Sequence, residues 1–109
     1  MKEITAYIKP HKLTEVTSAL QKVEGLRGVS IVDIKGFGRR GDKDSPHPVT
    51  DDLMDFAPYT KLEIFCRDDL LDEIISIIEK KAYTGLRGDG KIYVFDVEKA
   101  IKISKGEIG

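Results

Sequence analysis

The sequence is poor in cysteine and has no long apolar run. Its 109 residues include one cysteine, Cys66. A single thiol cannot form an internal disulfide, and without further ligands at suitable spacing it does not make a zinc site. No segment approaches the roughly 20 apolar residues of a membrane span, and the N-terminal residues lack the apolar stretch of a signal peptide. We therefore expect a cytoplasmic protein with no direct membrane insertion.

A large net charge of either sign is also absent. Eighteen basic and 19 acidic residues give a formal charge of -1, so no overall field attracts the chain to nucleic acid or to an anionic membrane. Hydrophobic residues make up 40% of the chain and charged residues 34%, which is typical of an ordered globular protein. At this length we expect one domain, residues 1–109, around a single core.

Two periods of apolar residues predict the fold. Alternation of apolar and polar residues predicts half-buried strands at residues 3–9, 26–35, 59–66 and 91–97. Spacings of three and four predict helices from Leu13 to Val23 and from Leu71 to near residue 84, the second capped by Asp68 or Asp69. The order βαββαβ is that of an α+β ferredoxin-like sandwich, in which both helices cover one face of an antiparallel sheet.

The other face of this sheet has no helix to cover it. It would carry Tyr7, Phe65 and Tyr93, or their alternate-face neighbours. An exposed apolar face of this kind usually meets a partner. We therefore expect the protein to form oligomers.

Residues 39–58 separate the second and third predicted strands. They follow neither period and include Pro46, Pro48 and Pro58, so they predict a loop of about 20 residues. A loop of this length is unusual inside a compact domain and often signals function.

Two glycine-rich turns carry basic residues. Their sequences are KGFGRR at 35–40 and TGLRGDGK at 84–91. Glycines let the backbone approach a ligand and present amide donors to an anion, while Arg and Lys add charge-assisted hydrogen bonds. The spacing is not that of a Walker A loop, and hairpins use the same short glycine patterns. These residues alone leave a polyphosphate site and purely structural turns as alternatives.

The ordered set of motifs resembles the PII family of nitrogen regulatory proteins over nearly the whole chain. The segments that carry the resemblance are IKPHKL at 8–13, KGFGR at 35–39, DFAP at 55–58, KLEI at 61–64, TGLRGDGKI at 84–92 and FDV at 95–97. The last two are the most diagnostic. The resemblance implies a homotrimeric regulator, not an enzyme, that binds ATP or ADP, with or without Mg²⁺, in clefts between subunits.

The resemblance also implies which residues bind the nucleotide. One side of each cleft would comprise Tyr7, Gly36, Phe37, Gly38, Arg39, Phe65, Gly88, Asp89, Gly90 and Lys91. The neighbouring subunit would supply Gly28, Val29, Ser30, Glu63 and Lys102. Arg39 and Lys91 would face phosphates, with Arg40 beside them. Glu63 would meet the ribose or adenine edge, because a carboxylate is repelled by phosphates.

Residues 39–58 occupy the place of the family's T-loop, through which PII proteins regulate a membrane transporter or an enzyme. The sequence departs most from the family here. Asp52 stands where many bacterial relatives have a uridylylated tyrosine. Arg40 and Tyr59 replace a glutamine and a lysine that meet 2-oxoglutarate in typical members. The resemblance therefore does not extend to uridylylation or to sensing of 2-oxoglutarate.

Alternative functions stay open. The arginine at the effector position is compatible with a PII-like regulator that responds to bicarbonate, and His47, Asp51 and Asp52 with one that responds to a metal, although we assign no metal site. A small ferredoxin-fold phosphohydrolase would use Arg39 or Arg40 to hold its substrate. No residue is an evident nucleophile activator, and we assign no catalytic residue.

Overall fold

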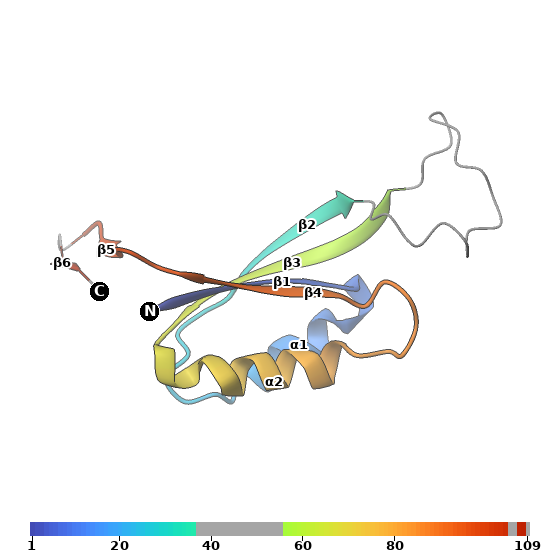
Figure 1. The fold of residues 1–109 in the computed structure, drawn as a ribbon, viewed down its shortest axis with the longest axis horizontal. Coiled ribbons are helices and arrows are strands. Elements are labelled where there is room, and N and C mark those ends of the chain that lie inside the picture. Colours follow the sequence, from blue (N-terminus) through green and yellow to red (C-terminus); the bar gives the residue numbers. More distant parts are fainter. Residues whose placement is uncertain (37–55, 105–106, 109) are drawn as a thin grey trace.

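Four strands form one antiparallel sheet in the order β2-β3-β1-β4 (Figure 1). The computed structural model describes residues 1–36, 56–104 and 107–108. The strands of the sheet are β1 Lys2–Ile8, β2 Ser30–Gly36, β3 Ala57–Cys66 and β4 Gly90–Asp96. β1 and β3 therefore lie inside the sheet, whereas β2 and β4 form its edges.

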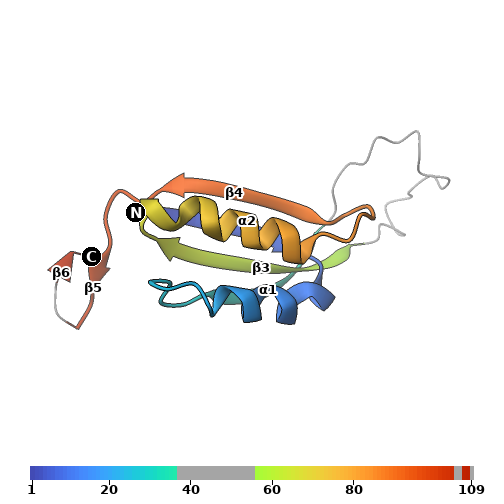
Figure 2. The same cartoon turned by 90° about the horizontal axis from the view of Figure 1, so that it is seen from below.

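Both helices cover the same face of the sheet, as Figures 1 and 2 show. α1, Leu13–Leu20, follows a 3-10 turn, η1 Pro10–Lys12, and α2, Leu71–Ala82, follows a second one, η4 Asp68–Leu70. Each helix buries part of the stripe that its spacing predicts, namely Val16 and Leu20 in α1 and Ile74, Ile78 and Ala82 in α2. This arrangement confirms the α+β ferredoxin-like βαββαβ fold.

The core lies between the sheet and the helices. The most buried apolar strand residues, each at most 1% exposed, are Ile4, Ala6, Ile8, Leu62 and Ile64. Full burial of a large aliphatic side chain stabilises the folded state by about 1.5–3 kcal/mol. The core therefore decides which face of each strand turns toward the helices.

Several element boundaries differ from the sequence predictions, and α1 ends at Leu20 rather than at Val23. β2 begins at Ser30 rather than at residue 26, and α2 ends at Ala82 because Tyr83 adopts an extended conformation. β3 begins at Ala57, so Pro58 belongs to the strand and not to the loop. A proline is tolerated there because the pairing of β3 with β1 reaches only to Thr60, and Pro58 therefore withholds no hydrogen bond from β1.

The predicted cap of the second helix is wrong. Neither η4 nor α2 has a side-chain cap. The carboxylate of Asp68 lies 2.8 Å from the amino group of Met1, and that of Asp69 accepts a hydrogen bond from Nε of Arg67 at 3.0 Å. Charge-assisted bonds to nearby cations take the place of bonds to the helix amides.

A short hairpin that the periodicity does not predict follows the sheet. It pairs β5, Ile101–Lys102, with β6, Glu107–Ile108, as a separate two-stranded sheet (Figure 1). Most of the predicted loop, residues 39–55, lies outside the described residues. Among the helices that are described, none has the length and apolar composition needed to cross a membrane.

Candidate functional site

The structure brings the start of the first glycine turn and the whole of the second to one end of the sheet. β2 ends at Gly36, which pairs with Ala57 at the start of β3. β4 begins at Gly90, which pairs with Ile8 at the end of β1. Strand pairing thus gathers parts of the chain that lie far apart in sequence. The rest of the first turn, Phe37, Gly38, Arg39 and Arg40, lies outside the described residues.

The second turn requires glycine at defined positions. Gly85, Gly88 and Gly90 have φ angles of 79°, 77° and 111°, a region that residues with a Cβ rarely adopt. A Cβ on Gly90 would also lie 1.6 Å from the carbonyl oxygen of Tyr7. The backbone of the turn therefore lies directly against the end of β1.

Asp89 holds this turn together from within. Its carboxylate accepts hydrogen bonds from the amides of Thr84 at 2.9 Å and Gly85 at 3.2 Å, and from the hydroxyl of Thr84. These bonds, with the bond from Thr84 first and a further contribution from Lys9, hold the pKa of Asp89 well below its usual range.

Lys9 reaches the same turn from the end of β1. Its ammonium lies 3.2 Å from the carboxylate of Asp89 and donates a hydrogen bond to the hydroxyl of Thr84 at 3.1 Å. That hydroxyl also accepts a bond from the amide of Leu86 at 3.1 Å. Sequence reasoning placed Lys9 and Thr84 in motifs without a role, because their meeting depends on the pairing of β1 with β4.

Lys91 follows the turn as an exposed residue of β4. Its ammonium makes no ion pair with the described residues. Lys91 pairs in register with Tyr7, which in turn pairs with Lys61. The glycine turn is therefore adjoined by a cation that is available to an anionic ligand.

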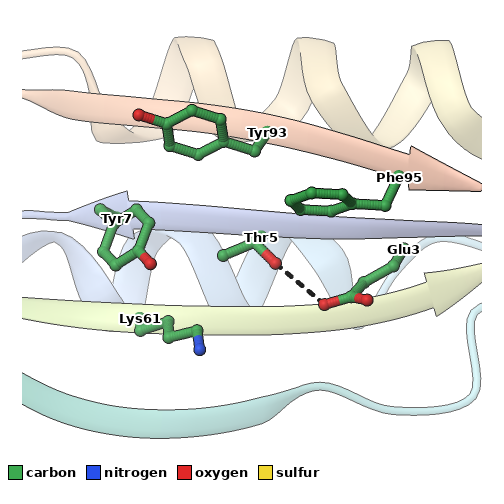
Figure 3. A pocket seen from close by; sticks show the side chains of 6 residues that line it. All are labelled: Glu3, Thr5, Tyr7, Lys61, Tyr93 and Phe95. Atoms are coloured by element: carbon green, nitrogen blue, oxygen red, sulfur yellow. Dashed lines mark hydrogen bonds between the residues drawn. The ribbon is translucent and has the colours of Figure 1, made fainter.

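The face of the sheet opposite the helices is open and rich in aromatic residues (Figure 3). Tyr93, Phe65 and Phe95 are 45%, 52% and 51% exposed. The rings of Tyr7 and Tyr93 meet edge to face, with centroids 6.1 Å apart and planes at 85°. A shallow hollow on this face is lined by Glu3, Thr5, Tyr7, Lys61, Tyr93 and Phe95. The prediction of an uncovered face with Tyr7, Phe65 and Tyr93 is confirmed.

Polar groups on the open face contact one another. The hydroxyl of Thr5 donates to the carboxylate of Glu3 at 3.0 Å, as Figure 3 shows. The ammonium of Lys61 lies 3.5 Å from the carboxylate of Glu63. The face therefore combines apolar area with charges that are locally balanced.

The remaining predicted nucleotide residues lie between the middle of the sheet, where Glu63 pairs with Thr5, and its other end, or outside it. Ser30, which follows Gly28 and Val29, pairs with Glu63. Phe65 pairs with Glu3, four positions along β1 from Tyr7, a separation of about 13 Å. Phe65 therefore lies nearer to Glu63 than to the glycine turn with which the sequence grouped it. Lys102 lies in β5, outside the main sheet.

The described residues contain no cluster of three or more His, Cys, Asp or Glu side chains that could hold a metal ion. His47, Asp51 and Asp52 lie outside the described residues. Cys66 is 5% exposed at the end of β3, and burial raises the pKa of its thiol. Its position is that of a packed core residue.

Comparisons with known proteins agree with the motifs. Residues 1–107 match the family described as nitrogen regulatory protein P-II. A nitrogen regulatory protein P-II of Bradyrhizobium diazoefficiens is 46% identical over 109 residues, which are 100% of this chain and 96% of the relative. Relatives from Klebsiella oxytoca and Escherichia coli, named nitrogen regulatory protein P-II and P-II 1, are each 43% identical over 107 residues. That region is 98% of this chain and 95% of each relative.

Proposed function

The chain belongs to the P-II family of nitrogen regulatory signal-transduction proteins, and from this premise we propose that it binds ATP or ADP, with or without Mg²⁺, and regulates a target protein. The observation that carries the proposal is the glycine turn at 84–90. Its backbone lies against β1, its one carboxylate is engaged internally, and Lys91 adjoins it as an exposed cation. Such a turn can present amides and positive charge to a polyphosphate.

We place the nucleotide between subunits of a homotrimer. The predicted binding residues fall into two groups along one sheet. Tyr7 and Gly88–Lys91 lie at one end, whereas Ser30 and Glu63 lie farther along, where Glu63 pairs with Thr5 in the middle of β1. One cleft unites the two groups when each comes from a different subunit. The open aromatic face provides the apolar area that such an assembly buries.

Within the cleft, Lys91 would face the phosphates together with Arg39 and Arg40. Tyr7, Gly36, Phe37 and Gly38 would complete that side. From the neighbour, Glu63 would meet the ribose or adenine edge beside Gly28, Val29 and Ser30, and Lys102 would reach the site from the C-terminal hairpin. Phe65, which pairs with Glu3 in the sheet, is proposed as a further contact on the same side of the cleft as the turn.

The proposed role is regulatory and includes no catalytic step. Nucleotide occupancy would alter loop 39–58 and with it the affinity for a target, a membrane transporter or an enzyme. This role fits a cytoplasmic protein whose residues 1–109 form one domain. Nucleic acid is not a proposed partner.

Calorimetric titration of the purified protein with ATP, ADP and AMP tests the proposal directly. We expect ATP and ADP to bind, at up to three sites per trimer. Parallel titrations with Mg²⁺, bicarbonate or 2-oxoglutarate would identify the effector. Absence of binding by all three nucleotides would overturn the proposal, and steady release of phosphate at turnover rates would favour a phosphohydrolase instead.

A further inference from the structure

The side chains of Lys9, Thr84 and Asp89 hold the glycine turn in its conformation without a ligand, and we call this group of three the lock. The hydroxyl of Thr84 and the carboxylate of Asp89 bond each other, and both contact the ammonium of Lys9, at 3.1 and 3.2 Å respectively. The amides of Thr84, Gly85 and Leu86 all donate to this group of side chains. The first half of the turn is thus held by bonds that need no nucleotide.

The lock leaves other donors of the turn unused. The amide of Gly88 makes no hydrogen bond to the described residues. Lys91 likewise keeps its ammonium outside the ion pairs of the described residues. The groups without internal partners therefore lie in the second half of the turn and at the start of β4.

The lock also removes an electrostatic obstacle. A bare carboxylate beside a polyphosphate would repel it. Here the oxygens of Asp89 are directed at Thr84 and Gly85, and Lys9 supplies a compensating positive charge. The carboxylate of Asp89 therefore does not prevent the turn from accepting an anion.

We propose that Lys9, Thr84 and Asp89 are positioning residues for the phosphates of the bound nucleotide, an inference that rests on the proposed function. Asp89 acts through the conformation of the turn and not by touching the ligand. Lys9 neutralises Asp89, and Thr84 links the two to the amide of Leu86. This arrangement raises the affinity for a polyphosphate, whereas the affinity for an uncharged nucleoside does not depend on it.

Titration with ATP and with adenosine separates positioning from general damage. Thr84→Val keeps the shape of the side chain but removes the hydroxyl, and we expect ATP to bind about tenfold more weakly while adenosine is unaffected. Lys9→Met should act in the same direction. Thr84→Ser should recover most of the lost ATP affinity. Thr14→Val, at an exposed threonine of α1, is the matched control and should bind ATP like the unsubstituted chain.

Each other outcome has a distinct meaning. Equal ATP binding by Thr84→Val and the unsubstituted chain would overturn the positioning role alone. Equal losses of ATP and adenosine would overturn it as well, because they would indicate damage to the whole cleft. Failure of the unsubstituted chain to bind any nucleotide would overturn the proposed function, and this inference with it.

Hydrogen exchange on the unsubstituted protein tests the lock even if the variants do not fold. Without nucleotide, the amides of Thr84 and Gly85 should be protected and that of Gly88 should exchange rapidly. ATP should then slow exchange at Gly88. Rapid exchange at Thr84 and Gly85 in the nucleotide-free protein would contradict a turn that is organised in advance.

Discussion

Lys91 is the described residue on which the proposed phosphate recognition depends most directly. It is exposed, follows Gly90 in β4 and makes no ion pair with the described residues. Asp89, two residues before it, has the opposite character, because its carboxylate accepts hydrogen bonds from Thr84 and Gly85 within the turn. The two charged residues would therefore support the proposed binding in different ways.

Substitution of Lys91 by alanine should weaken ATP far more than adenosine. Loss of one charge-assisted hydrogen bond costs about 1.5–3 kcal/mol, which corresponds to at least a tenfold weaker ATP affinity. Calorimetric titration measures the difference. The matched control is Lys80→Ala, at an exposed lysine in the last turn of α2, which should bind both ligands normally. Equal losses for ATP and adenosine in Lys91→Ala would show that Lys91 does not meet phosphate.

Asp89 makes part of the stability depend on pH. Because its pKa is lowered in the folded protein, its ionised form stabilises the fold above the unfolded pKa of about 3.9, and this contribution is lost as pH falls further. Thermal unfolding should show the unsubstituted protein to be more stable than Asp89→Asn at pH 7. The gap should stay constant down to about pH 5 and narrow below pH 4. A gap that widens on acidification would contradict the lowered pKa.

At the scale of elements, the glycine turn joins α2 to β4 under tight steric limits. Gly90 combines a φ of 111° with the close approach of the Tyr7 carbonyl. This contact allows β4 to pair with β1 from its first residue, Gly90, which lies opposite Ile8. The turn therefore places the first residue of the edge strand β4 directly against β1.

Gly90→Ala should destabilise the protein strongly. Its Cβ would overlap the backbone of β1, so the pairing between β1 and β4 has to shift. We expect a loss of at least about 3 kcal/mol, measured by denaturant unfolding. Gly28→Ala is the matched control, because an added Cβ there meets no atom within 4 Å and should cost little. Similar stabilities of the two variants would contradict the close contact.

The start of α2 provides a second test at this scale. Because Asp69 bonds Arg67 on the surface and caps no helix amide, Asp69→Ala should change the free energy of unfolding by at most about 0.5 kcal/mol. A functional N-cap would cost about 1 kcal/mol or more. Denaturant unfolding distinguishes these values, and a loss above about 1 kcal/mol would restore the capping role.

At the scale of the whole molecule, one layer of helices covers only one of the two faces of the sheet. The open face carries Phe65, Tyr93 and Phe95, each about half exposed. Water contact with so many aromatic side chains is unfavourable, and burial against other copies of the chain would remove it. Side chains alternate between the two faces along each strand. This alternation therefore determines both the core under the helices and the open face that the proposed trimer would bury.

Tyr93→Asp should weaken or abolish the trimer, because it places a charge on the apolar face that the assembly buries. Sedimentation velocity or light scattering measures the mass in solution. Tyr83→Asp is the matched control, since Tyr83 is 69% exposed just after α2, and it should leave the mass unchanged. A trimer that persists in Tyr93→Asp would show that the open face is not the interface.

Local sequence patterns were sufficient for the element types and for much of the core. The alternation at Ile4, Ala6 and Ile8 and the helical spacing of Ile74 and Ile78 identified buried residues correctly, since these periods follow from backbone geometry. The predicted start of β3 was wrong. Ala57 and Pro58 belong to this strand because they pair with β2, and a local sequence pattern does not show that pairing. Several predicted nucleotide residues, including Arg39 and Arg40, lie outside the described residues and stay predictions.

The sequence by itself determined the order of elements, the face that each strand buries, and membership of the family through the motif at 84–92. Only the tertiary structure decided that Lys9 contacts Asp89 and Thr84. It also decided that the backbone of Gly90 lies against the carbonyl group of Tyr7, and that Asp69 does not cap α2. The physical reason is distance along the chain. A local period is set by the next few residues, whereas a lysine at the end of β1 finds its carboxylate only when strand pairing brings β4 beside it.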